Sequence, residues 1–195
     1  GDVNNHLTEK GKQQALDTVS MVKAHGVDLI ISSPFVRTQE TAHLISSLLD
    51  IPVVTDDRIR EYNIGVFDNR PVADYFDHYK HSYIELDTRP EGGETHREVM
   101  NRSMAALHDF EKNYEGKTIL IVTHGGPARM MIAAASLLTE EDVKEDERAV
   151  ITTLYLGNAE VRKLDFKIVP RDETGAVNLH RPFIDEVEMR DSKGE

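Results

Sequence analysis

The sequence predicts an α/β fold: a three-layer sandwich in which helices cover both faces of a mostly parallel central sheet. Short apolar runs at Asp28–Ser32 and Lys117–Thr123 are typical of buried strands. Segments with the helical period of 3.6 alternate with these runs, which is the pattern of a parallel sheet with crossover helices. With 195 residues, of which 39% are apolar, the chain is long enough for one compact domain with one core.

The first half of the chain supplies two helices and two strands to this prediction. Thr8 can cap a helix that Gly26 ends, and its apolar positions are Ala15, Val19 and Val22. A second helix follows Pro34, after the strand at 28–32, with a core face of Ala42, Ile45, Leu48 and Leu49. Pro52–Thr55 is expected to be a short strand.

The second half begins with an irregular stretch at 56–93, which is rich in Arg, Asp, Tyr and Pro and is predicted to be a lid. Thr95-His-Arg-Glu98 has the form of a capping box and opens a helix with Val99, Leu107 and Phe110 facing inward. Pro127 fits the first turn of the helix after the strand at 117–123. The remaining elements are predicted as a short acidic helix from Thr139 and two edge strands, at 149–156 and 161–168.

The charge balance and the missing cysteines exclude several classes of function. There are 23 Lys and Arg against 35 Asp and Glu, a formal net charge of -12, which disfavours nucleic acid and acidic membranes as partners. The chain has no cysteine, so disulfides and thiolate chemistry are excluded, and a cytoplasmic location is expected. No pair among the histidines outside residues 123–126 and 173–187 has helical metal-ligand spacing with carboxylate neighbours, so these histidines are predicted to be surface residues. No cofactor is predicted.

Two predicted strands end in loops that could carry chemistry, because ligands bind at the carboxyl ends of parallel strands. Thr123-His124-Gly125-Gly126 places an imidazole at one strand end, followed by glycines and the N-terminus of a helix, which can hold an anion. Arg37 follows the other strand, where a guanidinium can bind a phosphate with two hydrogen bonds. For the segment at His124, the alternative is a glycine turn with an incidental histidine. For Arg37, the alternative is a surface salt bridge.

Two carboxylates are further candidates. Glu61, in Arg60-Glu-Tyr-Asn-Ile-Gly65, is a candidate general acid, and the alternative is a solvated loop carboxylate. Glu94 follows two glycines, where it could simply be a favourable charge at a helix N-terminus.

Taken together, five ordered motifs resemble those of the histidine phosphatase superfamily, which has the phosphoglycerate mutase-like fold. The resemblance covers about residues 4–168 and rests on segments at Leu7–Ala15, Ser33–Ala42, Glu61–Gly65, Glu91–Glu94 and Thr123–Gly126. In the same order, the corresponding motifs of the family are Leu-Thr-x-x-Gly-x-x-Gln-Ala, Ser-Pro-x-x-Arg-x-x-x-Thr-Ala, the loop that carries the general acid, Gly-Gly-Glu-Ser and the second-histidine motif.

The resemblance implies phosphomonoester hydrolysis through a phosphohistidine, without a metal. It makes His124 and Glu61 catalytic, with Glu61 as the general acid. It assigns phosphate binding to Arg37, Gly125 and Glu94. A small phosphorylated substrate or free phosphate is the expected ligand, and a phosphatase is favoured over a mutase because mutases of this family usually carry longer inserts.

One family motif has no counterpart here. The family begins with a strand ending in Arg-His-Gly, which supplies the nucleophile, and no Arg-His-Gly occurs in this sequence. The prediction is therefore a domain that lacks its first strand and is inactive as it stands. Three explanations of the missing strand remain: the chain is cut short upstream, another chain supplies the strand, or the protein is a non-catalytic binder. A gap in the sheet would favour strand exchange, so a homodimer is a predicted assembly.

The tail carries a second resemblance. Residues 173–187 contain Asn-Leu-His-Arg-Pro-Phe-Ile-Asp, which is similar to a segment of isoleucyl-tRNA synthetase catalytic domains. The predicted division is a phosphatase-like domain at 1–168 and a tail at 169–195 that links to a larger synthetase chain. The alternative function is thus a non-catalytic binding or regulatory module of an isoleucyl-tRNA synthetase.

Overall fold

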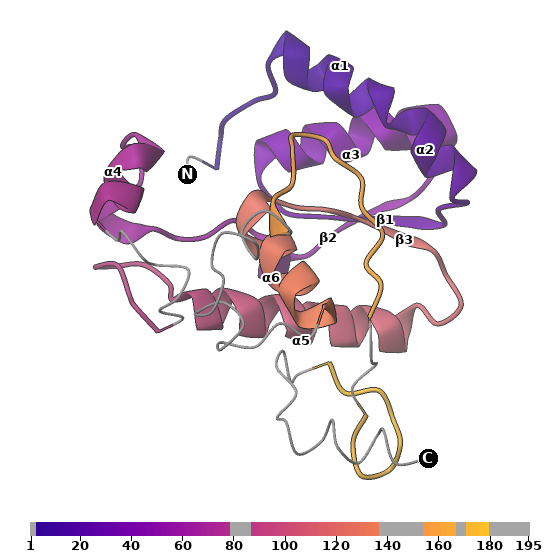
Figure 1. Ribbon diagram of the computed structural model, residues 1–195. Helices are drawn as coiled ribbons and strands as arrows, with labels where there is room; N and C mark the ends of the chain where they lie inside the picture. The colour runs from indigo at the N-terminus through magenta and orange to yellow at the C-terminus, as the bar shows by residue number, and fades with distance from the viewer. Residues whose placement is uncertain (1–2, 79–86, 137–153, 167–170, 180–195) are drawn as a thin grey trace.

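The structure is a computed structural model that describes residues 3–78, 87–136, 154–166 and 171–179 (Figure 1). Its centre is a parallel sheet of three strands in the order β2-β1-β3. The strands are β1 (Leu29–Ser32), β2 (Val53–Thr55) and β3 (Ile119–Val122). Ile30 of β1 pairs with Val53 on one side and with Leu120 on the other. The predicted α/β class with a parallel sheet is confirmed.

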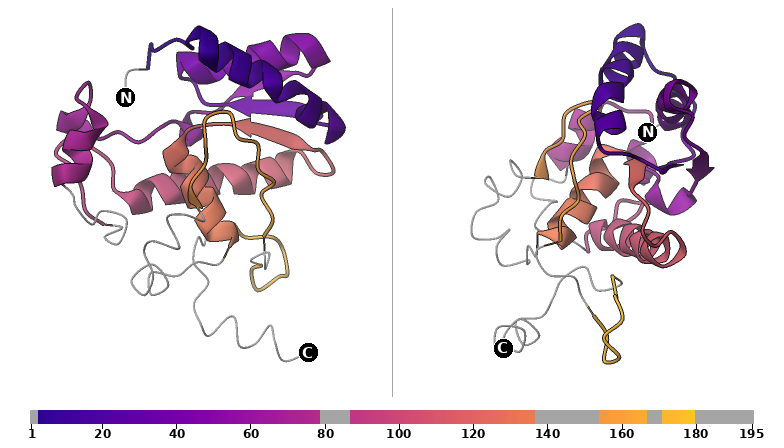
Figure 2. Two further views of the ribbon diagram at one scale, coloured as in Figure 1. Left: turned by 45° about the horizontal axis from the view of Figure 1, so that its top comes forward. Right: turned by 90° about the vertical axis from the view of Figure 1, so that its right-hand side faces the viewer.

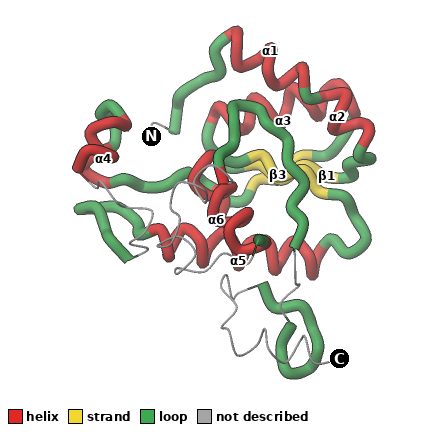
Figure 3. Tube along the Cα trace, in the orientation of Figure 1, coloured by secondary structure: helices red, strands yellow, loops and turns green. Residues whose placement is uncertain are grey.

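Helices cover both faces of this sheet, as Figures 1, 2 and 3 show. The α-helices are α1 (Glu9–Asp17), α2 (Val19–Ala24), α3 (Val36–Leu49), α4 (Val72–His78), α5 (His96–Asn113) and α6 (Gly125–Ala135). Two 3₁₀ turns, η1 (Asp57–Ile59) and η2 (Gly65–Phe67), lie in the irregular stretch after β2.

The two core layers are built from alternate residues of β1, because successive side chains of a strand point to opposite faces. Ile30 packs in a cluster with Ala42 and Ile45 of α3. Its neighbours Leu29 and Ile31 pack in the other cluster, with α5 and α6. Side chains at the end of β1 are therefore held by packing on both faces.

The predicted helix starts and stops are confirmed where the sequence supplies a cap. The Thr8 side chain accepts a hydrogen bond from the Gly11 N–H, and Gly26 follows α2 with a positive φ of 62°. Thr95 and Glu98 form both hydrogen bonds of a capping box at the start of α5. The single helix predicted before Gly26 is instead two, because the Thr18 hydroxyl donates to the Ala15 carbonyl and ends α1.

Other predictions were wrong in burial or in type. Leu48, expected in the core, is 58% exposed, because it lies on the outer side of α3. The four residues of β3, expected to be buried, are half-buried, because within the described residues β3 has a strand neighbour only in β1. Residues 161–166, expected to be strand, have no regular structure. The predicted helix from Thr139 and residues 149–153 lie outside the described residues.

Part of the tail packs on the domain. Arg171 and Val177 form an isolated antiparallel bridge, and Leu179 is buried in the same cluster as α5 and α6. The Leu179 N–H donates to Nδ1 of His108 on α5. The division at residue 168 and the link to a synthetase remain predictions. Across the described ranges, no helix is long and apolar enough to cross a membrane.

Candidate active site

The carboxyl ends of β1 and β3 lie side by side, because the two strands are adjacent and parallel. Ser32 pairs with Val122 at the end of the ladder, and the Ser33 N–H donates to the Val122 carbonyl at 2.9 Å. The loop that leads into α3 and the loop that leads into α6 therefore start at the same edge. This brings together residues that are about 90 positions apart in the sequence.

The His124 imidazole, at the start of α6, makes hydrogen bonds to two side chains of the segment that leads from β1 into α3. His124 is the N-cap residue of α6. Its Nδ1 lies 3.0 Å from Nη2 of Arg37, and its Nε2 lies 2.8 Å from Oγ of Ser33. A guanidinium can only donate, so Nδ1 is the acceptor. In the neutral ring, Nε2 then carries the proton and donates it to Ser33, which defines the tautomer.

Burial keeps this imidazole neutral. Only 7% of His124 is exposed, and burial lowers its pKa to about 3, with a further contribution from the positive charge of Arg37. The Phe35 ring contacts His124 edge-on, with 4.9 Å between the ring centroids, and the Arg37 guanidinium lies 5.0 Å from the centre of the same ring. Phe35 therefore contacts both polar side chains of the pair.

The carboxyl group of Glu61 has the opposite shift. Burial raises its pKa, although the Tyr62 N–H, the charge of Arg37 and the Gly126 N–H each act to lower it. The Tyr62 N–H donates to Oε1 of Glu61 at 3.0 Å. A carboxyl group with a raised pKa retains its proton to higher pH, as a general acid must.

The two glycines after His124 have different roles. A Cβ on Gly126 would collide with the Tyr62 ring and the Glu61 carboxylate. A Cβ on Gly125 would have only Nη2 of Arg129 nearby, at 3.8 Å. Gly126 is therefore needed for the segment at 58–63 that carries Glu61, called the acid loop below, to pack against α6. The space beside Gly125 is open. Phosphate binding by Gly125 stays a prediction.

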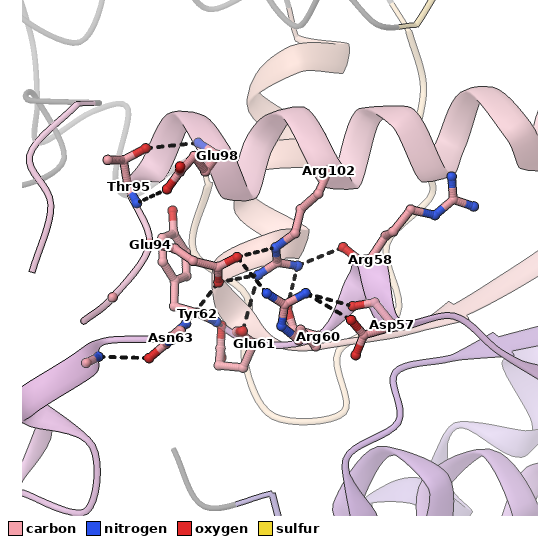
Figure 4. A network of polar contacts seen from close by, with 12 residues as sticks. Asp57, Arg58, Arg60, Glu61, Tyr62, Asn63, Glu94, Thr95, Glu98 and Arg102 are labelled. Carbon is pink, nitrogen blue, oxygen red and sulfur yellow. Dashed lines mark hydrogen bonds and ion pairs between the residues drawn. The ribbon is translucent and has the colours of Figure 1, made fainter.

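Glu94 lies in a network of arginines behind Glu61 (Figure 4). Its carboxylate accepts hydrogen bonds from Arg60, at 2.8 Å, and from Nε of Arg102, at 3.1 Å. It also accepts one from the Asn63 N–H, at 3.1 Å. These contacts tie Glu94 to the acid loop, and the phosphate-binding role assigned to it stays a prediction.

The structure thus brings His124, Arg37 and Glu61 to one edge of the sheet. Sequence reasoning did not single out Ser33, although it directly follows a predicted strand, or Arg102, for which a helical position alone gives no signal. The side chain of His6 is 73% exposed, and its Nδ1 lies 2.6 Å from Oε1 of Glu40. Within the described ranges, no group of three or more His, Asp or Glu side chains could hold a metal ion.

Comparison with known families gives one match that covers most of the chain. Residues 1–167 match the model of the histidine phosphatase superfamily (branch 1). Among curated proteins, "Probable phosphoglycerate mutase GpmB" of Enterobacter sp. (strain 638) is 28% identical, over 96% of this chain and 90% of that protein. The protein of the same name from Escherichia coli (strain K12 / DH10B) is 32% identical, over 64% of this chain. The match spans 60% of the length of that relative.

Solved structures show the same fold. Bacillus stearothermophilus YhfR superposes with a TM-score of 0.67 at 24% identity, over 91% of this chain and 88% of that one. A mycobacterial glucosyl-3-phosphoglycerate phosphatase in complex with inorganic phosphate gives a TM-score of 0.62 at 24% identity, over 71% and 73% of the two chains.

Proposed function

Because this chain belongs to the histidine phosphatase superfamily, we propose that its site acts on small phosphomonoesters and hydrolyses them through a phosphohistidine. The observation that supports this most directly is the contact between Arg37 and His124, at 3.0 Å, where β1 and β3 end together. It places a permanent positive charge and an imidazole at one point. A phosphoryl group requires such a site.

Arg37 and His124 would hold the phosphoryl group. Arg37 can donate two parallel hydrogen bonds to phosphate oxygens. His124 is neutral when no anion is bound, but a phosphate dianion beside it would favour the imidazolium, because an opposite charge stabilises the charged ring. Phosphate binding should therefore take up a proton.

Glu61 would act as the proton donor. In the first step the phosphoryl group passes from the substrate oxygen to an imidazole nitrogen, and Glu61 gives its proton to the departing oxygen. In the second step water attacks the phosphohistidine, and its proton returns to the Glu61 carboxylate. The raised pKa of Glu61 supports this assignment because the group must be protonated when the substrate binds.

The nucleophile is the one part of this mechanism for which these residues offer no candidate. The family resemblance assigns it to an Arg-His-Gly segment, and no such segment occurs in the 195 residues. The proposal therefore assigns phosphate binding and proton donation to this chain. It expects hydrolysis only in the presence of an Arg-His-Gly strand.

Hydrolysis of para-nitrophenyl phosphate without added metal tests the proposal. The chain is compared with a version that carries an upstream Arg-His-Gly strand. Activity in the extended version, lost on Arg37→Ala, is the expected result. No activity in either version, together with no binding of inorganic phosphate, would show that the site does not serve phosphomonoesters.

The products distinguish a phosphatase from a mutase. The curated relatives carry a mutase name, whereas a structural neighbour is a phosphatase. We propose the phosphatase, which releases inorganic phosphate. With a phosphoglycerate as substrate, formation of the isomeric phosphoglycerate without free phosphate would favour the mutase instead.

A further inference from the structure

The backbone that carries Glu61 lies between η1 and η2, in a stretch without helix or strand. Such a segment has no hydrogen-bond ladder of its own, so its carbonyls and N–H groups need other partners. A general acid must keep its carboxyl group within hydrogen-bond reach of the departing oxygen. Whatever holds this backbone therefore sets the position of the acid.

Arg102 of α5 supplies the partner of three carbonyls among residues 58–61 (Figure 4). Its Nη1 donates to the carbonyls of Arg58 and Arg60, both at 2.7 Å, and its Nη2 donates to the carbonyl of Glu61 at 3.2 Å. One guanidinium thus caps three carbonyls of the acid loop. Its side chain is only 12% exposed, so water offers little competition for these bonds.

Glu94 completes the support from the other side. Its carboxylate accepts from Nε and Nη2 of Arg102, at 3.1 and 3.2 Å, and thereby balances the charge of the largely buried guanidinium. The same carboxylate binds the Arg60 side chain and the Asn63 N–H. Glu94 therefore reaches the loop on both sides of Glu61.

A third contact joins this loop to the phosphate end of the site. The Thr123 hydroxyl donates to the carbonyl of Ile59 at 2.7 Å, and Thr123 directly precedes His124. The acid loop is thus fixed to α5 by Arg102, to the segment before α5 by Glu94 and to the end of β3 by Thr123. These three side chains therefore contribute to its position relative to the imidazole, together with the close packing at Gly126.

We propose that Arg102 and Glu94 are positioning residues, which clamp the backbone of residues 58–63 so that the Glu61 carboxyl group stays buried beside α6. The consequence of this clamp for catalysis, proton donation by Glu61, rests on the proposed function. The clamp itself can be measured without turnover. Neither residue is a catalytic residue, because each acts through the backbone that carries Glu61.

The test uses two substitutions that keep the charge. Arg102→Lys retains the positive charge but loses the planar fork that reaches three carbonyls and a carboxylate together. Glu94→Asp retains the negative charge on a shorter side chain. Arg97→Lys and Asp87→Glu are the matched controls, since this ion pair also involves α5 and makes none of the hydrogen bonds to residues 58–63 described above.

The readout is the pH titration of the Glu61 side-chain carbon, followed by carbon-13 NMR in the whole chain. In the wild type and both controls we expect the pKa to lie above the ordinary value for a glutamic acid. In Arg102→Lys and Glu94→Asp it should fall toward that ordinary value, because a loosened loop admits water. The double variant should shift no further than the larger single shift, because the two residues act as one unit.

Thermal unfolding followed by circular dichroism verifies that each variant is folded at the temperature of the titration. An unchanged Glu61 titration in folded Arg102→Lys and Glu94→Asp would overturn the proposal. Arg102→Lys and both control variants are also titrated with inorganic phosphate, which should bind within about twofold of the wild type. Absence of phosphate binding in the wild type would count against the proposed function, while the Glu61 titration would still decide whether the clamp exists.

Discussion

At the scale of single residues, the hydrogen bonds of His124 determine which ring nitrogen is protonated. Arg37 donates to Nδ1, so the proton of the neutral ring lies on Nε2 and points to Ser33. A nearby donor or acceptor commonly fixes a histidine tautomer in this way. The nitrogen that faces Arg37 is thus the one whose protonation state a bound anion would change.

Nitrogen-15 NMR of the wild-type imidazole tests this assignment, and the Ser33→Ala substitution tests how much the Nε2–H hydrogen bond contributes to stability. It leaves a buried N–H without its partner, which costs about 1–3 kcal/mol of the free energy of unfolding. Nitrogen-15 NMR of the imidazole should show only the Nε2–H form in the wild type at neutral pH. If the wild type gives an even mixture of the two tautomers, the assignment is wrong.

The low pKa of His124 makes stability depend on pH. Its pKa is about 3 in the folded protein and close to 6.5 in the unfolded chain, so between these values the unfolded state binds more protons. The free energy of unfolding should therefore fall as pH decreases from about 6.5 toward 3. Urea denaturation over this range should give a shallower pH dependence for His124→Asn. The remaining slope should include His96, whose pKa burial lowers to about 4.

Proton uptake on phosphate binding is the corresponding prediction for the ligand. If the anion protonates His124, the affinity for inorganic phosphate should increase as pH falls below 7. Calorimetry in two buffers with different enthalpies of ionisation measures the protons taken up. Equal heats in both buffers would mean that the imidazole stays neutral in the complex.

At the scale of elements, the packing of the acid loop on α6 depends on Gly126. Gly126→Ala should destabilise the fold by about 1–3 kcal/mol, because the added Cβ meets Tyr62 and Glu61. Gly125→Ala is the matched control, with open space beside it, and its stability should stay within about 0.5 kcal/mol of the wild type. Chemical denaturation compares them, and equal losses would contradict the different packing of the two glycines.

The sequence predicted those elements whose signals are local. Thr8, Gly26 and the Thr95–Glu98 box act within a few residues of themselves, and each lies at the helix end predicted from it. The burial of β3 and the irregular course of 161–166 depend on which segments pack nearby, and hydrophobic pattern alone does not contain that information.

The candidate site was predictable in part for the same reason. Arg37, Glu61 and His124 stand in motifs that each span a few residues, and the order of those motifs indicated that they meet. Arg102 is one polar residue on a long helix, and only the folded chain shows that it reaches three carbonyls of the loop at 58–61. The hydrogen bond of Ser33 likewise depends on the pairing of β1 with β3, which places His124 beside it.

At the scale of the whole molecule, the two core layers should contribute independently to stability. Ile45 lies in the layer with α3, and Ile59 lies in the layer with α5 and α6. Ile45→Val and Ile59→Val should each cost about 0.5–1.5 kcal/mol. Because they belong to separate core clusters, the double variant should lose the sum to within about 0.5 kcal/mol. A clear departure from the sum in urea denaturation would show that the sheet couples the layers.

The parallel pairing of β1 and β3 also affects the order of events in folding. The contact between Arg37 and His124 joins residues 87 positions apart, so the site has a high contact order. Closing so long a loop costs entropy before the contact contributes anything in return. The site should consequently form late, after the helices between the two strands have docked. Bound phosphate should then slow unfolding without accelerating refolding, which would make it a probe of the fully assembled chain.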